Sequence, residues 1–227
     1  MVHKTNNGSS NKHYDISSVY SAGCNSANAI YEKTGNPQLS DIQIMWISEM
    51  LHAAQFQNKK APNFLIFGVG FDSPTWKQIN CNGRTIFVED DLEWMEKVSK
   101  AFPGLEMHKV DYKSSVAQVN DFFSSPTHDF SIHTTVDAEC FDVILIDAPK
   151  GYTDEQPGRM IPAYWSDKKA SRCLHQENKA TIVFLHDIER PAEQTIMKHC
   201  FSSENGWHHL GNVGGPFGAL SGWALYP

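Results

Sequence analysis

The chain has 227 residues, of which 41% are hydrophobic and 20% are charged. This length is enough for one sizeable hydrophobic core and short for two, so we expect a single globular domain. The 26 acidic and 19 basic side chains give a formal net charge of −7. No long basic run is present to follow a phosphate backbone, which argues against a nucleic-acid partner. The apolar runs have the length of strands, well short of the roughly 20 residues that cross a bilayer, so we expect no membrane span.

Residues 1–38 are rich in Ser, Asn, Lys and Gly, which predicts a flexible arm before a domain over residues 39–227. The first residues lack the charged-then-apolar order of a secretion signal. We therefore expect a cytosolic protein, or a protein of the Golgi lumen if an N-terminal anchor has been removed. The five cysteines are odd in number and form no CxxC pair, which predicts free buried thiols.

Apolar periodicity predicts strands that alternate with helices. The first helix is expected from Ser40, placed as an N-cap before Asp41. The expected strands cover 63–67, 84–88, 105–110, 141–146 and 181–185, and the further helices cover 92–101, 114–123, 163–174 and 191–200. Residues 124–139 are interpreted as an insertion loop, and 207–213 with 219–226 as a terminal antiparallel pair. The pattern predicts an α/β fold, a mostly parallel seven-stranded sheet with helices on both faces.

Ligands of such sheets bind at the carboxyl ends of the strands, so residues there are candidates for a site. Gly68 and Gly70 follow the first strand, and their missing side chains would let a ligand approach the backbone. Glu89 lies 21 residues beyond Gly68, where a carboxylate can accept both hydroxyls of a ribose. The structural alternatives are an ordinary glycine turn and an acid that stabilises a helix N-terminus. This pairing does not separate NAD from S-adenosylmethionine.

Two later strands also end in ionisable side chains. Asp147 follows an apolar strand, where an ionised carboxylate costs desolvation unless a cationic cofactor group, an acceptor hydroxyl or a metal uses it, or it caps the following loop. His186 ends the next strand and could take a proton from an acceptor atom. Asp147 and Asp187 could instead hold a divalent cation. Arg159 could grip an acceptor carboxylate through its planar fork, or form an ion pair with a nearby acid.

The chain resembles the DUF579 family of plant polysaccharide biosynthesis proteins, which includes glucuronoxylan 4-O-methyltransferases and the irregular-xylem group. The resemblance covers about residues 40–201 and depends on five segments in the family's order, NFLIFGVGFDS, GRTIFVEDD, FDVILIDAPKGY, PGRM and ATIVFLHDIER. It implies an S-adenosylmethionine-dependent enzyme with the Rossmann-like class I methyltransferase fold. It also favours S-adenosylmethionine over NAD as the cofactor.

The resemblance implies that Gly68 and Gly70 face the cofactor, Glu89 the ribose, Asp147 the methionine end or the acceptor, and His186 the acceptor proton. The full candidate site comprises Gly68, Gly70, Phe71, Asp72, Ser73, Glu89, Asp90, Asp111 and Asp147 for the cofactor, His186 and Asp147 for catalysis, and Tyr152, Arg159, Tyr164, Asp187 and Arg190 for the acceptor.

The expected reaction is methyl transfer to a hydroxyl oxygen of a sugar or of glucuronic acid. Family members usually carry a Golgi membrane anchor before this domain, whereas this chain begins with a polar arm. The acceptor therefore stays open between a saccharide and a soluble metabolite or heterocycle methylated on oxygen or nitrogen. A different class of function is a non-catalytic glycan-binding or scaffold protein of the same fold. Cofactor binding separates the enzyme from the scaffold.

Overall fold

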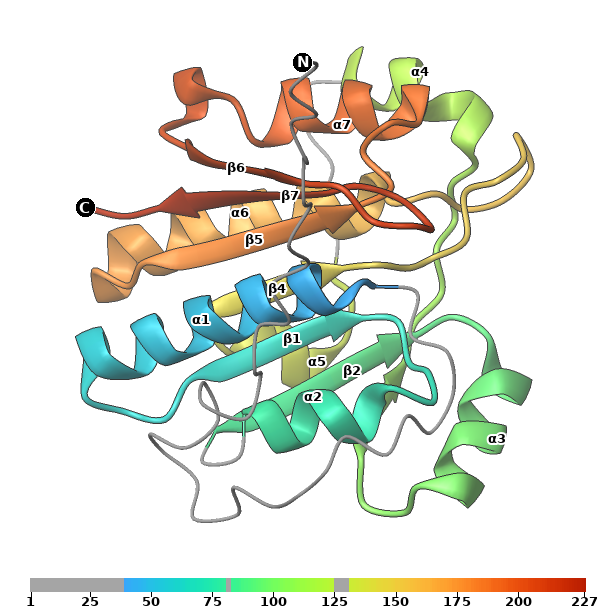
Figure 1. Cartoon of the computed structure of the whole chain (residues 1–227). Coiled ribbons are helices and arrows are strands. Elements are labelled where there is room, and N and C mark those ends of the chain that lie inside the picture. The colour runs from blue at the N-terminus through green and yellow to red at the C-terminus, as the bar shows by residue number, and fades with distance from the viewer. Residues whose placement is uncertain (1–38, 81–82, 125–130) are drawn as a thin grey trace, which may run out of the picture. The chain divides into compact units, whose positions relative to one another are not determined.

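The computed structural model describes residues 39–80, 83–124 and 131–227, so the arm predicted for 1–38 lies outside the described residues. The elements in chain order are α1 (Asp41–Asn58), β1 (Asn63–Phe67), α2 (Ser73–Ile79), β2 (Arg84–Glu89), α3 (Leu92–Ala101), β3 (Glu106–Lys109), η3 (Val116–Gln118), α4 (Val119–Ser124), α5 (Thr134–Ala138), β4 (Val143–Ile146), α6 (Met160–Glu177), β5 (Thr181–His186), α7 (Pro191–Cys200), η4 (Ser203–Asn205), β6 (His208–Val213) and β7 (Leu220–Leu225). Figure 1 shows their arrangement.

The strands form one seven-stranded sheet in the order β3-β2-β1-β4-β5-β7-β6. The first five strands of this order are parallel, whereas β7 runs antiparallel to both β5 and β6. The predicted mostly parallel sheet with a terminal antiparallel pair is therefore confirmed. Strand order reverses between β1 and β4, and a doubly wound sheet opens a crevice at such a switch point.

The central strands are buried on both faces. Their side chains alternate between the two faces, and helices cover each face. On one face Trp46 of α1 packs edge-on against Phe184, and Trp76 of α2 against Phe64. The opposite face, which includes Phe67 and Leu185, packs against α6 and α7 in the main core. The helices on the two faces are visible in Figure 1. Burial on both sides explains why the central strands have continuous apolar sequences.

A local signal in the sequence accounts for the start of α1. The Ser40 side chain accepts a hydrogen bond from the Gln43 backbone N–H and the Gln43 side chain bonds back to Ser40, which confirms the predicted N-cap. The expected insertion loop, however, contains the short helix α5. That helix was missed because five residues are too few to show periodicity. Among the described residues no helix is long and apolar enough to cross a membrane.

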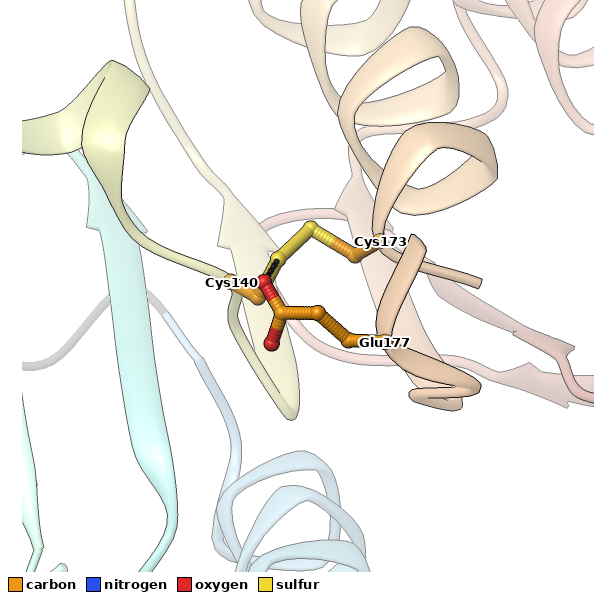
Figure 2. Close-up of side chains that lie close together, drawn as sticks. All are labelled: Cys140, Cys173 and Glu177. Atoms are coloured by element: carbon orange, nitrogen blue, oxygen red, sulfur yellow. Dashed lines mark hydrogen bonds between the residues drawn. A yellow bond between two sulfur atoms is a disulfide. The ribbon is translucent and has the colours of Figure 1, made fainter. Parts of the chain in front are cut away.

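The prediction of free thiols is wrong for two of the cysteines. Cys140, just before β4, and Cys173, on α6, form a disulfide with their Cα atoms 5.8 Å apart (Figure 2). The Glu177 carboxylate lies 2.9 Å from the Cys140 sulfur. The two cysteines are 33 residues apart in sequence, and only the packing of α6 beside β4 brings them together. Cys200 agrees with the prediction, since it is free and buried.

We predict that reducing this disulfide lowers the free energy of unfolding by about 2–4 kcal/mol, because the bond restricts the unfolded chain. Urea unfolding with and without a reductant measures the effect. Cys200→Ala should keep the response to reductant, whereas the double variant Cys140→Ser/Cys173→Ser should lose it. Equal stability of the wild-type protein in both conditions would contradict the prediction.

Candidate active site

A cavity of about 540 Å³ lies at the carboxyl ends of β1, β2 and β4, beside the point where strand order reverses. The structure brings ten of the predicted site residues to it: Gly68, Gly70, Phe71, Asp72, Ser73, Glu89, Asp90, Asp147, Tyr152 and Arg159. These residues come from four separate segments of the chain. Their convergence follows from the parallel pairing of the strands that precede them.

The turn between β1 and α2 exposes its backbone to the cavity. Gly68 has a φ of +115°, and a Cβ there would lie 3.0 Å from the Cβ of Ala148, so only glycine fits without strain. A Cβ on Gly70 would lie 2.7 Å from an Asp72 carboxylate oxygen. The turn is held from α3, because the indole N–H of Trp94 donates to the Val69 carbonyl at 2.6 Å.

Glu89 orders the loops on either side of the cavity. Its Oε2 accepts a hydrogen bond from the backbone N–H of Val69 at 3.1 Å, and its Oε1 accepts from the N–H groups of Asp90 and Asp91, each at 2.9 Å. Burial raises the pKa of Glu89. Each carboxylate oxygen has two lone-pair sites, so the group keeps acceptor capacity on Oε2 for a ligand hydroxyl. Its predicted ligand role and its structural role are therefore compatible.

The cavity carries an excess of negative charge. Burial and the negative charge of Asp147 raise the pKa of Asp72 to about 6. The Asp72 side chain accepts a hydrogen bond from the Trp76 indole N–H at 3.1 Å. The charge of Asp147 disfavours the ionised form of Asp72, and a cation placed near both carboxylates offsets this effect. The cavity is therefore suited to a ligand with a positively charged group.

Asp147 and His186 form a hydrogen-bonded pair across the ends of β4 and β5. The His186 Nδ1 lies 2.8 Å from the Asp147 Oδ1. Burial raises the pKa of Asp147, but the hydrogen bond and charge of His186 and the charge of Arg159 outweigh it and leave the pKa lowered. Burial lowers the pKa of His186, but the hydrogen bond and charge of Asp147 outweigh it and leave the pKa raised. The pair is therefore stabilised as a carboxylate and an imidazolium.

Only Asp147 of this pair reaches the cavity. The His186 side chain is 1% exposed, against 22% for Asp147. The other ring nitrogen of His186, Nε2, is buried and has no hydrogen-bond partner among the described residues. It lies under the loop before β7, where a Cβ on Gly218 would be 3.0 Å away. The geometry thus puts the imidazole behind the carboxylate rather than against an acceptor.

The acceptor candidates Asp187, Arg159 and Arg190 form buried ion pairs. Asp187 Oδ2 lies 2.7 Å from Arg159 Nη2 and 2.8 Å from Arg190 Nη2. The Arg190 guanidinium also lies 4.3 Å from the ring centre of Tyr152, which is 61% exposed at the cavity mouth. Tyr152 therefore presents an aromatic face supported from behind by a cation.

The suggested cation site coincides with one of these ion pairs. Ligand atoms of Asp147, His186 and Asp187 lie within 4.8 Å of one another. Arg159 Nη2, however, is 3.6 Å from Asp147 Oδ1 as well as 2.7 Å from Asp187 Oδ2. A cation of the chain itself thus neutralises both carboxylates, and the geometry favours the ion-pair alternative over a divalent ion.

Five of the fifteen predicted site residues do not line the cavity. His186, Asp187 and Arg190 belong to the ion-pair cluster beside it, and Asp111 and Tyr164 lie elsewhere. Asp111 is exposed, pairs with Lys109 and lines a separate cavity of about 230 Å³. Tyr164, on α6, packs edge-on against Phe122 of α4. Sequence reasoning in turn missed several residues that line the main cavity, namely Val69, Trp76, Asp91, Trp94, Ala148, Lys150, Gln156 and Pro157. The only sequence signal for these residues is that they lie next to the motifs already identified. No periodicity marks a side chain that faces a cavity.

The strand order and the cavity at its switch point define a Rossmann-like domain with the class I methyltransferase fold. A family model described as IRX15/IRX15L/GXM matches residues 48–139 and 131–214, which is more than half of the chain. The chain belongs to the IRX15/IRX15L/GXM family. The resemblance drawn from the five sequence segments is thereby confirmed.

Curated relatives come from Arabidopsis thaliana. Glucuronoxylan 4-O-methyltransferase 2 is 39% identical over 154 residues, which cover 60% of this chain and 52% of the relative. Arabinogalactan O-methyltransferase 1 is 34% identical over 172 residues, which cover 66% of this chain and 58% of the relative. The chain thus spans a little over half the length of these relatives.

Human methyltransferase-like protein 13, in complex with S-adenosylhomocysteine, is 14% identical, with a TM-score of 0.49 and coverage of 81% of each chain.

The Asp147–His186 pair predicts a pH dependence of stability. A raised pKa of His186 gives stabilisation that is complete below its ordinary value of 6.5 and is lost as the pH rises through the folded value. A lowered pKa of Asp147 gives stabilisation that is complete above 3.8 and is lost as the pH falls through the folded value. We expect the stability difference between wild type and His186→Gln to be largest between these two limits.

Urea unfolding across a pH series measures this difference. His175→Gln, at an exposed position of α6, is the matched control and should follow the wild-type pH dependence. A wild-type advantage over His186→Gln that stays constant into the alkaline range would show that the imidazole is not held as the charged partner of Asp147.

Proposed function

We propose that this chain is an S-adenosylmethionine-dependent methyltransferase that methylates a hydroxyl oxygen of a saccharide. Family membership and relatives named as glucuronoxylan and arabinogalactan methyltransferases support the reaction and the acceptor class. The observation that carries the proposal is the acidic cavity at the switch point, where Glu89, Asp72 and Asp147 meet an exposed glycine backbone.

The residues of the cavity fit this cofactor. Glu89 keeps one acceptor site, on Oε2, for a ribose hydroxyl. The unfavourable proximity of Asp72 and Asp147, expressed in the pKa of Asp72 near 6, is relieved by a positively charged ligand group. When bound, S-adenosylmethionine supplies a methyl group on a positively charged sulfur that leaves as a neutral thioether. Phe71 and Trp94, packed edge-on at 5.4 Å, add apolar surface to the wall.

We assign the acceptor proton to the Asp147–His186 pair. The Asp147 carboxylate faces the cavity and receives the proton as the acceptor oxygen forms its bond to the methyl carbon. His186 holds Asp147 in place through the 2.8 Å contact and compensates its charge. The exposed ring of Tyr152 at the mouth offers a platform for a sugar ring. Holding the acceptor in line with the methyl group supplies much of the rate enhancement.

Asp147→Asn tests this assignment. We expect turnover to fall by about 10²- to 10⁴-fold, the usual contribution of a general base. Affinity for S-adenosylhomocysteine should change much less than turnover, because its sulfur is neutral and only its ammonium group carries a positive charge. Calorimetry measures the affinity, and transfer of labelled methyl groups measures turnover. Asp121→Asn, an exposed position on α4, is the control. Full activity of Asp147→Asn would remove this carboxylate from the proton transfer.

Glu89→Gln tests the cofactor site separately. The amide places an NH2 group where one carboxylate oxygen accepts, so the contact with a ribose hydroxyl is lost or the loops that hold the ligand are displaced, at a cost of about 1–3 kcal/mol. We expect the Kd for S-adenosylhomocysteine to rise roughly tenfold to a hundredfold. Glu93→Gln, exposed on α3, should bind as the wild type does. An unchanged Kd in Glu89→Gln would place the ribose elsewhere.

The wild-type chain decides between the classes of function. Calorimetric titration with S-adenosylmethionine and S-adenosylhomocysteine comes first, followed by an acceptor panel of glucuronoxylan oligosaccharides, arabinogalactan and small heterocycles. Methylation of a saccharide supports the proposal. Methylation of heterocycles alone supports the small-molecule alternative, and absence of cofactor binding supports a non-catalytic scaffold.

The disulfide is evidence about the cellular compartment in which the protein acts. Disulfides form and persist mainly in oxidising compartments, and Cys140–Cys173 closes a separation of 33 residues. We therefore favour the lumenal alternative over the cytosolic one. Peptide mapping of protein isolated from cells after rapid alkylation should recover the two cysteines as a disulfide-linked pair. Alkylated free thiols at both positions would contradict this location.

A further inference from the structure

Arg159 occupies a central position between the ends of β4 and β5. It stands at the start of α6 and is only 2% exposed. Its Nη2 donates a hydrogen bond to the main-chain carbonyl of Asp147 at 2.5 Å, and its Nη1 donates to the main-chain carbonyl of His186 at 3.2 Å. These are the two residues whose side chains form the 2.8 Å pair. One planar group thus joins the backbones of both members of the pair.

Two buried carboxylates hold the guanidinium. Asp187 Oδ2 lies 2.7 Å from Nη2 of Arg159, and Glu193 Oε1 lies 3.2 Å from Nη1. Glu193 is in the first turn of α7, where an acid usually serves the helix dipole at the surface. Here its side chain is 1% exposed and points to Arg159. Glu193 is not among the site residues predicted from the sequence.

The cluster sets three acidic side chains against three basic ones. Asp147, Asp187 and Glu193 lie within ion-pair distance of Arg159, Arg190 or His186. Buried ions are tolerated when they are paired and hydrogen-bonded, and removal of one partner leaves an uncompensated charge. Arg159 contacts all three carboxylates, at 2.7, 3.2 and 3.6 Å. The arrangement of the whole cluster therefore depends on it.

We propose that Arg159 is a positioning residue that fixes Asp147 against His186, and that Glu193 holds the Arg159 guanidinium in place. The proposal rests on the proposed function for the role of Asp147. It replaces the expectation that Arg159 grips an acceptor carboxylate, because both of its terminal nitrogens bind protein atoms. A planar fork with several fixed donors suits this task, whereas a single ammonium does not.

Arg159→Lys is the principal test. Lysine keeps the charge but cannot bind both carbonyls in the fork geometry. We expect kcat to fall roughly a hundredfold, as for small misplacements of catalytic groups, with little change in the KM for the acceptor. The loss should be equal for a glucuronosyl xylo-oligosaccharide and for its methyl ester. Arg172→Lys, exposed on the same helix, is the matched control.

A titration of His186 by NMR provides a readout that needs no turnover. The hydrogen bond and charge of Asp147 keep the pKa of His186 raised, so release of Asp147 should move the pKa back toward 6.5. Asp187 also raises this pKa and the Arg159 charge lowers it, and Arg159→Lys retains both charges. Glu193→Gln, which is nearly isosteric, should change kcat and the His186 titration in the same direction to a smaller extent.

The outcomes are distinct. Wild-type kcat and an unchanged His186 titration in Arg159→Lys would overturn the proposal. A rise in KM restricted to the free-carboxylate acceptor would also overturn it, because Arg159 would then be an acceptor ligand. If Arg159→Lys does not fold, Glu193→Gln carries the test, and wild-type values there would be equally decisive against the proposal. If the wild-type chain neither binds S-adenosylhomocysteine nor methylates any acceptor, the proposed function fails, and the His186 titration still tests the positioning role.

Discussion

The parallel pairing of β2, β1, β4 and β5 is the constraint on which the site depends. Because these strands run in one direction and in register, with Phe67 opposite Val88 on one side and Ile146 on the other, their carboxyl ends meet at one edge of the sheet. The ends of β1, β2 and β4 each deliver one piece of the cavity, and the end of β5 delivers His186, which pairs with Asp147. The central strands themselves are apolar and buried on both faces, so their ends are the first positions at which polar side chains can be placed, and there they need partners to offset desolvation.

The ends of β4 and β5 carry ionisable groups that are stable only together. Asp147 and His186 are paired, and Arg159 compensates Asp187 and Glu193 while it binds the backbone of both members of the pair. Such a network gives a site with fixed geometry, because no member can move without leaving another charge unpaired. The part of the cavity that we assign to the methyl donor is organised differently. There Glu89 orders two loops through backbone N–H groups, and the glycine turn leaves room for a ligand.

Elements outside the cavity restrain this edge of the sheet. The disulfide fastens α6 beside the start of β4, and Arg159 is the N-cap residue of α6. Strand β7 pairs antiparallel with β5, and Gly218, in the loop before β7, lies against the His186 side chain. The helix, the disulfide and the terminal hairpin therefore all restrain the elements that carry Asp147, His186 and Arg159.

The sequence by itself determined the order and type of most elements, the glycine turn, and the acids at the strand ends, because strand and helix periodicity and local caps are properties of neighbouring residues. It also determined the family, through motifs that are contiguous in the chain. Only the tertiary structure decided that Cys140 meets Cys173, that Asp111 and Tyr164 lie away from the cavity, that His186 sits behind Asp147, and that Arg159 is enclosed by carboxylates. These features join residues far apart in the chain, and the orientation of a side chain at a strand end depends on packing, which leaves no periodic trace in the sequence.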